Sequence, residues 1–529
     1  MRNLSRFAWL LAFICGSVGL VEGSSLDATP QSGIQALKVN DFARAERIFL
    51  EVVQKDPTGA NFACLAVAES SLGHLENAIA HFHRSLELGN DSASVHYYLG
   101  VTHLKKHDPR DGIRELKIAI AKDAKLEGAR SALGVALVNA GKPREAIPYL
   151  ERARVASPND AQIWASLVRA EFESGDAKQA IRTVDAATEA IPENSRLAAT
   201  LASLCLRHRM PQKARLLLES ASETSPQDTT LKLLLAEASL RAGEPVEALA
   251  VLKGLPSEGG APGELAYLRG TAYLLAGKLE EARPSLSAAL SADSANVNYL
   301  FAYAGLQGSE LHYADALATL QRASDLAPRS EAILYQMAVT DALMGRYEES
   351  ARVCGEALSL SSQPDEEYFL MGITKLAQRD IAGAAKDFRK ALTHRPGVAA
   401  YHAALGVAQF EAGVPEESHQ ELDRALALDP QMAPSYLWRA RLWTRKGRSD
   451  KARADLETYV ALNPNSASAY QELSHIYQAE GESAKASAAQ ARYQSVKTQK
   501  NENEDDASFL DQLWLARIRE GLGQVSERP

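Results

Sequence analysis

Small and apolar residues recur along this chain with a period of 34 residues. From Ala93, 12 units of 34 residues follow one another to Lys500 without insertion or deletion, and two more units precede them, starting at Leu26 and Gly59. The eighth position of each unit is small except at Val168, and the twentieth position is always small. Helices approach closely only where side chains are short, so these two positions predict where two helices of one unit cross.

Glycine and proline predict where the two helices end. Position 15 favours glycine because a chain leaving a helix there needs the left-handed conformation, and position 32 favours proline because proline cannot continue a helix. Nine units have glycine at position 15: Gly73, Gly141, Gly175, Gly243, Gly277, Gly345, Gly413, Gly447 and Gly481. Eight units have proline at position 32: Pro57, Pro158, Pro192, Pro226, Pro328, Pro396, Pro430 and Pro464. Each unit is therefore predicted to hold a helix A that ends before position 15 and a helix B that ends before position 32.

Small residues at positions 8 and 20, apolar residues at 7 and 24, a small residue at 27 and proline at 32 resemble the tetratricopeptide repeat family. The resemblance covers Leu26 to about Lys500. It implies an all-α fold, a right-handed superhelical solenoid of about 14 helix-turn-helix repeats. The family mostly holds other proteins, although a fold alone does not decide a function.

Departures from the repeat predict the domain boundaries. We predict a signal peptide at 1–23, an N-terminal repeat arm at 24–262 with units 1–7, a C-terminal repeat arm at 263–500 with units 8–14, and an acidic link with a capping helix at 501–529. Glycine and proline are frequent at 254–263, which is either a hinge between the arms or a rigid shortened helix. The helix predicted from Ser508 to Gly521 either covers the last repeat, which we favour, or docks onto another protein.

The N-terminus has the parts of a secretory signal. Arg2 and Arg6 precede the apolar run 7–15, and small residues follow near Gly23. We expect cleavage near Gly23 and export to the periplasm or the exterior, with no integral membrane span in the mature chain. An uncleaved anchor is the alternative.

The charge balance argues against nucleic acid as a partner. Removing residues 1–23 leaves 58 − 2 = 56 basic and 67 − 1 = 66 acidic residues, a net charge of −10. Nucleic-acid binding relies on basic surfaces that neutralise phosphates, so no nucleic-acid partner is expected.

Three cysteines remain in the mature chain, Cys64, Cys205 and Cys354, in units that lie four repeats apart. Stacked helices are about 8–10 Å apart, so these sulfurs are too distant from one another for a disulfide within the chain. We expect buried cysteines that pack as small apolar residues.

Histidines suggest one possible metal site. His96, His103 and His107 are seven and four residues apart, which would place them on one helical face, as zinc or nickel would require. The other interpretation is packing, because positions 4 and 11 are where the resembled family places aromatic rings. We see no cysteine or carboxylate at ligand spacing beside them, so we predict no metal and no cofactor.

The candidate binding residues follow from the resemblance. In that family, positions 2, 5, 9, 12 and 13 of helix A line the concave groove. In units 8–12 these positions give an apolar and aromatic groove, with predicted partner-binding residues Tyr267, Leu274, Phe301, Tyr335, Val339, Phe369, Ile373 and Phe410. An exposed apolar stripe of this length would bind a protein. In units 5–7 they give an Arg-rich patch that includes Arg169, Arg196, Arg207 and Arg241. The patch is either a solvated face or a site for carboxylates or anionic sugars.

No catalytic motif is evident: the sequence holds no nucleophile elbow, P-loop, zinc-protease motif or pair of cysteines two residues apart. We therefore predict that the protein is not an enzyme. It would be a protein–protein interaction scaffold in the cell envelope that binds extended peptide or protein segments on its concave surface. The alternative is an envelope component of exopolysaccharide assembly or export that binds anionic glycan through the Arg-rich repeats.

Overall fold

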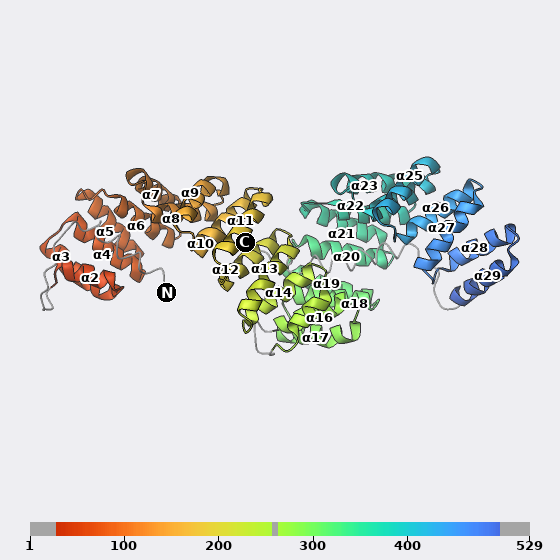
Figure 1. Ribbon diagram of the computed structural model, residues 1–529, viewed down its shortest axis with the longest axis horizontal. Helices are drawn as coiled ribbons and strands as arrows, with labels where there is room; N and C mark the ends of the chain where they lie inside the picture. The colour runs from red at the N-terminus through yellow and green to blue at the C-terminus, as the bar shows by residue number, and fades with distance from the viewer. Residues whose placement is uncertain (1–27, 256–262, 498–529) are drawn as a thin grey trace. The chain divides into compact units, whose positions relative to one another are not determined.

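The computed structural model describes residues 28–255 and 263–497. Within these ranges the chain forms 28 helices and no strand, so the predicted all-helical repeat solenoid is confirmed (Figure 1). Helix A of the successive units is α2 (Pro30–Lys38), α4 (Gly59–Leu72), α6 (Ala93–Lys105), α8 (Glu127–Asn139), α10 (Ala161–Glu173), α12 (Ser195–Arg207), α14 (Thr229–Arg241), α16 (Glu264–Leu275), α18 (Val297–Ser309), α20 (Glu331–Leu343), α22 (Asp365–Ala377), α24 (Ala399–Glu411), α26 (Ala433–Arg445) and α28 (Ala467–Ala479).

Helix B of the same units also follows the predicted period. These helices are α3 (Phe42–Lys55), α5 (Leu75–Glu87), α7 (Pro109–Lys122), α9 (Pro143–Ala156), α11 (Ala177–Ala190), α13 (Pro211–Thr224), α15 (Pro245–Leu252), α17 (Leu279–Ala292), α19 (Tyr313–Leu326), α21 (Tyr347–Leu360), α23 (Ile381–His394), α25 (Pro415–Leu428), α27 (Ser449–Leu462) and α29 (Ser483–Lys497). Helix α15 has 8 residues where α17 has 14, as the glycines and prolines that follow it predict.

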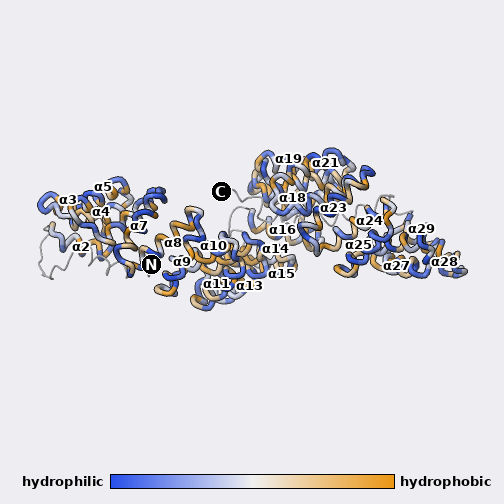
Figure 2. Tube along the Cα trace, turned by 90° about the horizontal axis from the view of Figure 1, so that it is seen from above, coloured by the Kyte–Doolittle hydropathy of each residue, from blue (hydrophilic) through white to orange (hydrophobic). Residues whose placement is uncertain are grey.

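The described chain divides into two compact units between Leu231 and Lys232. In the first, buried residues of α2–α6 and of α7–α10 form two apolar clusters. In the second, one large cluster runs from Leu233 to Met432. Figure 2 shows hydrophilic and hydrophobic stretches alternating along the helices, as expected when one side of each helix is packed and the other is solvated.

Several predictions fall outside the described residues: the signal peptide at 1–23, the capping helix at 501–529, and residues 256–262 of the suggested hinge. The division into arms between residues 262 and 263 stays a prediction. Among the helices that are described, none is both long and apolar enough to cross a membrane.

Close helix crossing explains the small residue at position 8. A Cβ atom added to Gly134 would lie 2.6 Å from Cγ of Leu150 on the facing helix B, and one added to Gly270 would lie 2.6 Å from Cγ of Leu286. Both distances are shorter than van der Waals contact allows, so a side chain there would push the two helices apart.

The helix A stop is more regular than the glycines alone indicate. All nine predicted glycines have positive φ, and so do Asn40, His107, Arg209, Leu311 and Arg379, which occupy position 15 in the five remaining units. In unit 9, where position 15 is not glycine, Leu311 itself adopts φ 64°. The backbone turn is thus imposed by the packing of helices A and B, and glycine only relieves its strain.

Leu311→Gly is expected to raise the free energy of unfolding by about 0.5–1 kcal/mol, because it removes the steric cost of a left-handed leucine. Little packing is lost, since Leu311 is 69% exposed. Leu326→Gly is a matched control, because Leu326 is also exposed but ends the right-handed helix α19. That control is expected to destabilise by a similar amount. Urea unfolding followed by circular dichroism measures both changes. Destabilisation by Leu311→Gly would contradict the interpretation that the left-handed Leu311 backbone is strained.

Buried or partly buried polar pairs join helix A to helix B at positions 11 and 23. His81 Nδ1 lies 2.7 Å from Glu69 Oε2, Thr183 Oγ1 donates to Glu171 Oε1 at 3.0 Å, and Thr319 Oγ1 donates to Gln307 Oε1 at 2.7 Å. Lys375 and Asp387 form an ion pair at the same two positions. Because burying an unpaired polar group is costly, these pairs favour one register of helix A against helix B.

Cys64, Cys205 and Cys354 are buried, as predicted, and form no disulfide with one another. Burial raises the pKa of the Cys205 thiol to about 11, and Cys354 is fully buried with its thiol 3.4 Å from the Glu367 carbonyl oxygen. Thiols in such surroundings stay protonated and pack as apolar groups.

Candidate functional site

The predicted apolar groove residues are buried. Their exposed fractions are 9% for Tyr267, 1% for Leu274, 3% for Phe301, 0% for Tyr335, 0% for Val339, 1% for Phe369, 6% for Ile373 and 4% for Phe410. The expectation of an exposed apolar stripe is therefore corrected: these side chains lie inside the packed solenoid. Their role as partner-binding residues stays a prediction.

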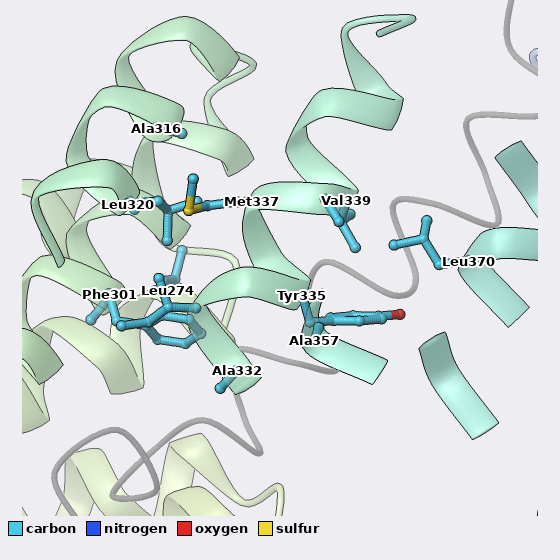
Figure 3. Packing of buried hydrophobic residues seen from close by; sticks show 14 of the residues in the cluster. Leu274, Phe301, Ala316, Leu320, Ala332, Tyr335, Met337, Val339, Ala357 and Leu370 are labelled. Atoms are coloured by element: carbon cyan, nitrogen blue, oxygen red, sulfur yellow. The ribbon is translucent and has the colours of Figure 1, made fainter. Parts of the chain in front are cut away.

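Ring packing between successive units explains this burial. Phe369 on α22 lies 5.6 Å from the ring of Phe388 on α23 and 4.8 Å from that of Tyr401 on α24, measured between ring centroids. Figure 3 shows Tyr335 in the same cluster, beside Val339 and Ala357. Large rings at position 5 fill the space between one helix A and the next, so they hold the units together.

An accessible surface lies instead on helices α8, α10 and α12 of the first compact unit. These three A helices are adjacent, because α10 contacts both α8 and α12. Their groove positions carry mostly polar side chains that are exposed or half-buried. We call these residues the Arg-rich surface: Asn139, Gln162, Arg169, Glu173, Arg196, Ser203 and Arg207.

A hydrogen bond and a ring stack connect α10 to its neighbours on the Arg-rich surface, and an ion pair within α10 orients Arg169. Arg169 on α10 donates to the Asn139 amide oxygen on α8, and its Nε lies 3.7 Å from Glu173 Oε1. Phe172 on α10 stacks against His208, which follows α12, with ring centroids 4.4 Å apart. Arg169 is thus oriented from two sides while its side chain stays 31% exposed.

Short residues lie between the charged ones. Ala165 on α10 and Ala199 on α12 occupy position 5, where Phe301 and Phe369 fill the corresponding space in the second compact unit. Ser203 occupies position 9 of α12, and its hydroxyl donates to the Ala199 carbonyl oxygen at 2.8 Å. The surface therefore combines small residues with guanidinium and amide groups.

The predicted arginines divide between the two compact units. Arg169 and Arg207 both lie on the Arg-rich surface, and Arg207 is exposed. Arg241 ends α14 in the second unit, where its Nη2 lies 2.6 Å from Glu237 Oε1 and its side chain is 16% exposed. Guanidinium groups bind carboxylates with two parallel hydrogen bonds, so the exposed arginines could hold acidic groups of a ligand.

Arginines of α26 are already engaged within the protein. The Arg441 guanidinium lies 4.6 Å from the Trp438 ring and its Nε donates to Glu472 Oε1 at 2.9 Å. The Arg445 guanidinium lies 3.6 Å from the Phe410 ring centroid. Trp438 lies between Phe410 and Arg441, a place that depends on contacts between repeat units and that the sequence pattern did not predict.

The fold and its helix A surface define an α-solenoid of paired helices, a class that presents an extended surface for binding. Models of the tetratricopeptide repeat match residues 137–204 and 206–271, and a second set matches 369–433 and 411–470. The matched repeats are thus similar to the tetratricopeptide repeat, and helix pairs of the same kind run through the other described units.

Similar proteins share parts of this architecture. Protein FlbA of Caulobacter vibrioides is 28% identical over 136 residues, which are 25% of this chain and 23% of that protein, so the match spans about a quarter of its length. The anaphase-promoting complex hetero-tetramer Cut9-Hcn1 covers 86% of this chain and 99% of its own, at 15% identity and TM-score 0.46. YrrB, described as a TPR protein with an unusual peptide-binding site, covers 35% of this chain and 94% of its own, at 23% identity and TM-score 0.31. None of these similarities defines what this chain binds.

Proposed function

We propose that the protein is a non-catalytic scaffold that binds an extended, acidic polypeptide segment across α8, α10 and α12. The observation that carries the proposal is the contrast in accessibility between the two sets of groove positions. In units 8–12 the predicted partner-binding side chains are buried in the protein's own packing, whereas Arg169, Ser203 and Arg207 are accessible.

The chemistry of the Arg-rich surface suits a polypeptide. Side-chain amides such as those of Asn139 and Gln162 can both donate to and accept from the peptide groups of an extended chain. Arginine side chains can hold Asp and Glu carboxylates of the same segment. Small residues such as Ala165 and Ala199 leave room for its backbone.

The proposed place of action is the cell envelope, outside the cytoplasm. This part of the proposal rests on the sequence of residues 1–23 alone. Cell fractionation with an antibody against the repeats tests it independently of ligand binding.

Arg169→Ala and Arg207→Ala are each expected to weaken binding of an acidic peptide about tenfold, because each removes one charge-assisted contact. A random peptide display library panned on the wild-type protein supplies the probe, and fluorescence anisotropy of the enriched peptide supplies the affinity. The binding should weaken further as salt rises from 50 to 500 mM, since exposed charges are screened. Arg152→Ala is the control, because Arg152 is exposed on helix B of unit 4.

Enrichment of neutral apolar peptides, or binding that Arg169→Ala and Arg207→Ala leave unchanged, would contradict the proposal. The second candidate ligand, an anionic polysaccharide, would use the same guanidinium groups. It is distinguished by titrating alginate: salt-sensitive binding of alginate with no enriched peptide would transfer the assignment to glycan.

A further inference from the structure

Three potential metal ligands meet where helix A of unit 3 turns into helix B. His103 lies on α6, Asp108 is the N-cap residue of α7, and Asp111 lies in the first turn of α7. One ligand atom from each residue lies within 4.8 Å of the other two. We predicted no carboxylate at ligand spacing beside these histidines, and Asp108 and Asp111 correct that statement.

His103 is not accounted for by the fold alone. Its side chain is only 9% exposed, yet neither ring nitrogen makes a hydrogen bond to any described residue. Buried ring nitrogens normally have a hydrogen-bond partner, because burying one without a partner is costly. His107, the third histidine considered in the sequence, has φ 62° and lies beyond the end of α6, so it does not share the helical face of His103.

The separation of the His103 and Asp108 ligand atoms suits a shared ion better than a hydrogen bond. His103 Nδ1 lies 3.4 Å from Asp108 Oδ2, beyond the usual range for such a bond. Two ligands at about 2.0–2.1 Å from a tetrahedral metal ion are about 3.3 Å apart. Asp108 Oδ1 meanwhile accepts a hydrogen bond from the Asp111 backbone N–H at 3.3 Å, which leaves Oδ2 directed at His103.

We propose that His103, Asp108 and Asp111 bind a divalent first-row transition metal ion, with zinc as the best match. An imidazole favours zinc and its neighbours over magnesium or calcium, which prefer oxygen ligands alone. The two aspartate side chains are 39% and 33% exposed, so water can complete the coordination. The ion would join the end of α6 to the start of α7.

The surrounding charges are compatible with this assignment. Arg114 pairs with Asp111 and would compete with the ion. Its Nη2 also lies 3.2 Å from Glu115 Oε1, so Arg114 keeps a partner when Asp111 turns to a metal.

Isothermal titration of the purified full chain with Zn²⁺ tests the site, using protein without a polyhistidine tag. His103→Phe and Asp111→Asn are each expected to weaken zinc binding at least about tenfold, or to abolish it. His83→Gln is the matched control, because His83 is exposed, lies outside the cluster and should leave zinc binding unchanged. Zinc should also raise the thermal unfolding midpoint of the wild type and of His83→Gln, but not that of Asp111→Asn.

The unfolding midpoints of all variants without metal show whether a loss of zinc binding results from misfolding or from the loss of a ligand. Asp111→Asn conserves the shape of the side chain, so its metal-free midpoint should stay close to that of the wild type. Equal zinc affinity in the wild type, His103→Phe and Asp111→Asn would overturn the proposal. Absence of zinc binding by the wild type would do the same.

Discussion

Tyr335→Ala should lower the free energy of unfolding by about 3–5 kcal/mol, the cost of removing a large buried ring. Tyr335 is 0% exposed on α20 and belongs to the largest apolar cluster, with Val339 and Ala357 beside it (Figure 3). The cavity cannot close easily, because helices on both sides are held by their own packing. Thermal and urea unfolding followed by circular dichroism measure the loss.

Tyr335→Phe is the control for this substitution, since it keeps the ring in place. It should cost much less than Tyr335→Ala. A ring exposed in a groove would instead allow Tyr335→Ala to leave the unfolding midpoint unchanged. Such a result would restore the apolar stripe and contradict the burial of Tyr335.

Gly372→Val is expected to lower the free energy of unfolding by about 3 kcal/mol, because it forces apart two helices that cross at that residue. A Cβ atom on Gly372 would overlap the Phe388 ring of α23. The ring cannot turn away freely, since Phe388 is fully buried and packs against Phe369. Unfolding midpoints in urea provide the measurement.

Gly355→Ala gives the matched comparison in the preceding unit. Gly355 lies within α21, and a Cβ atom there would meet no atom within 4 Å. This substitution should stabilise the protein by about 0.5–1 kcal/mol, because alanine favours a helix more than glycine does. If Gly372→Val did not lower the free energy of unfolding, the close crossing of α22 and α23 at Gly372 would be contradicted.

The sequence was sufficient to predict the helix pairs because the strongest constraints lie within one repeat. The residue at position 8, such as Gly134 or Gly270, must be small because helix A crosses helix B there. The residue at position 15, such as Gly175, forms the turn between the two helices. Leu311 and Arg379 show the limit of such reasoning. They adopt the same left-handed turn without glycine, because packing on both sides outweighs a local steric cost.

The candidate site could be predicted only in part, because accessibility depends on how one unit packs on the next. Phe301 and Ala199 occupy the same position of their repeats, yet Phe301 is buried against a neighbouring unit while Ala199 remains half-exposed. Groove positions carried over from the family do not distinguish these cases. The residue types did identify Arg169 and Arg207, since a long cationic side chain seldom fills a core.

The metal ligands were missed for a related reason. The sequence spacing predicted that His103 and His107 share one helical face. Helix α6 ends before His107, however, and the chain turns there. That turn carries Asp108 and Asp111 to His103. A search for ligands across the predicted turn, as well as along the helix, would have found them.

Photo-crosslinking from the Arg-rich surface tests the central proposal most directly. A photoreactive phenylalanine derivative is placed at Ser203 on α12 or, as the control, at Arg152 on α9, and the protein is irradiated in an extract of its native cells. We predict a polypeptide adduct from Ser203 that mass spectrometry maps to an acidic segment, that disappears with Arg169→Ala and Arg207→Ala combined, and that is absent from Arg152. Equal crosslinking from Ser203 and Arg152, or a Ser203 adduct that survives the loss of both arginines, would contradict the account.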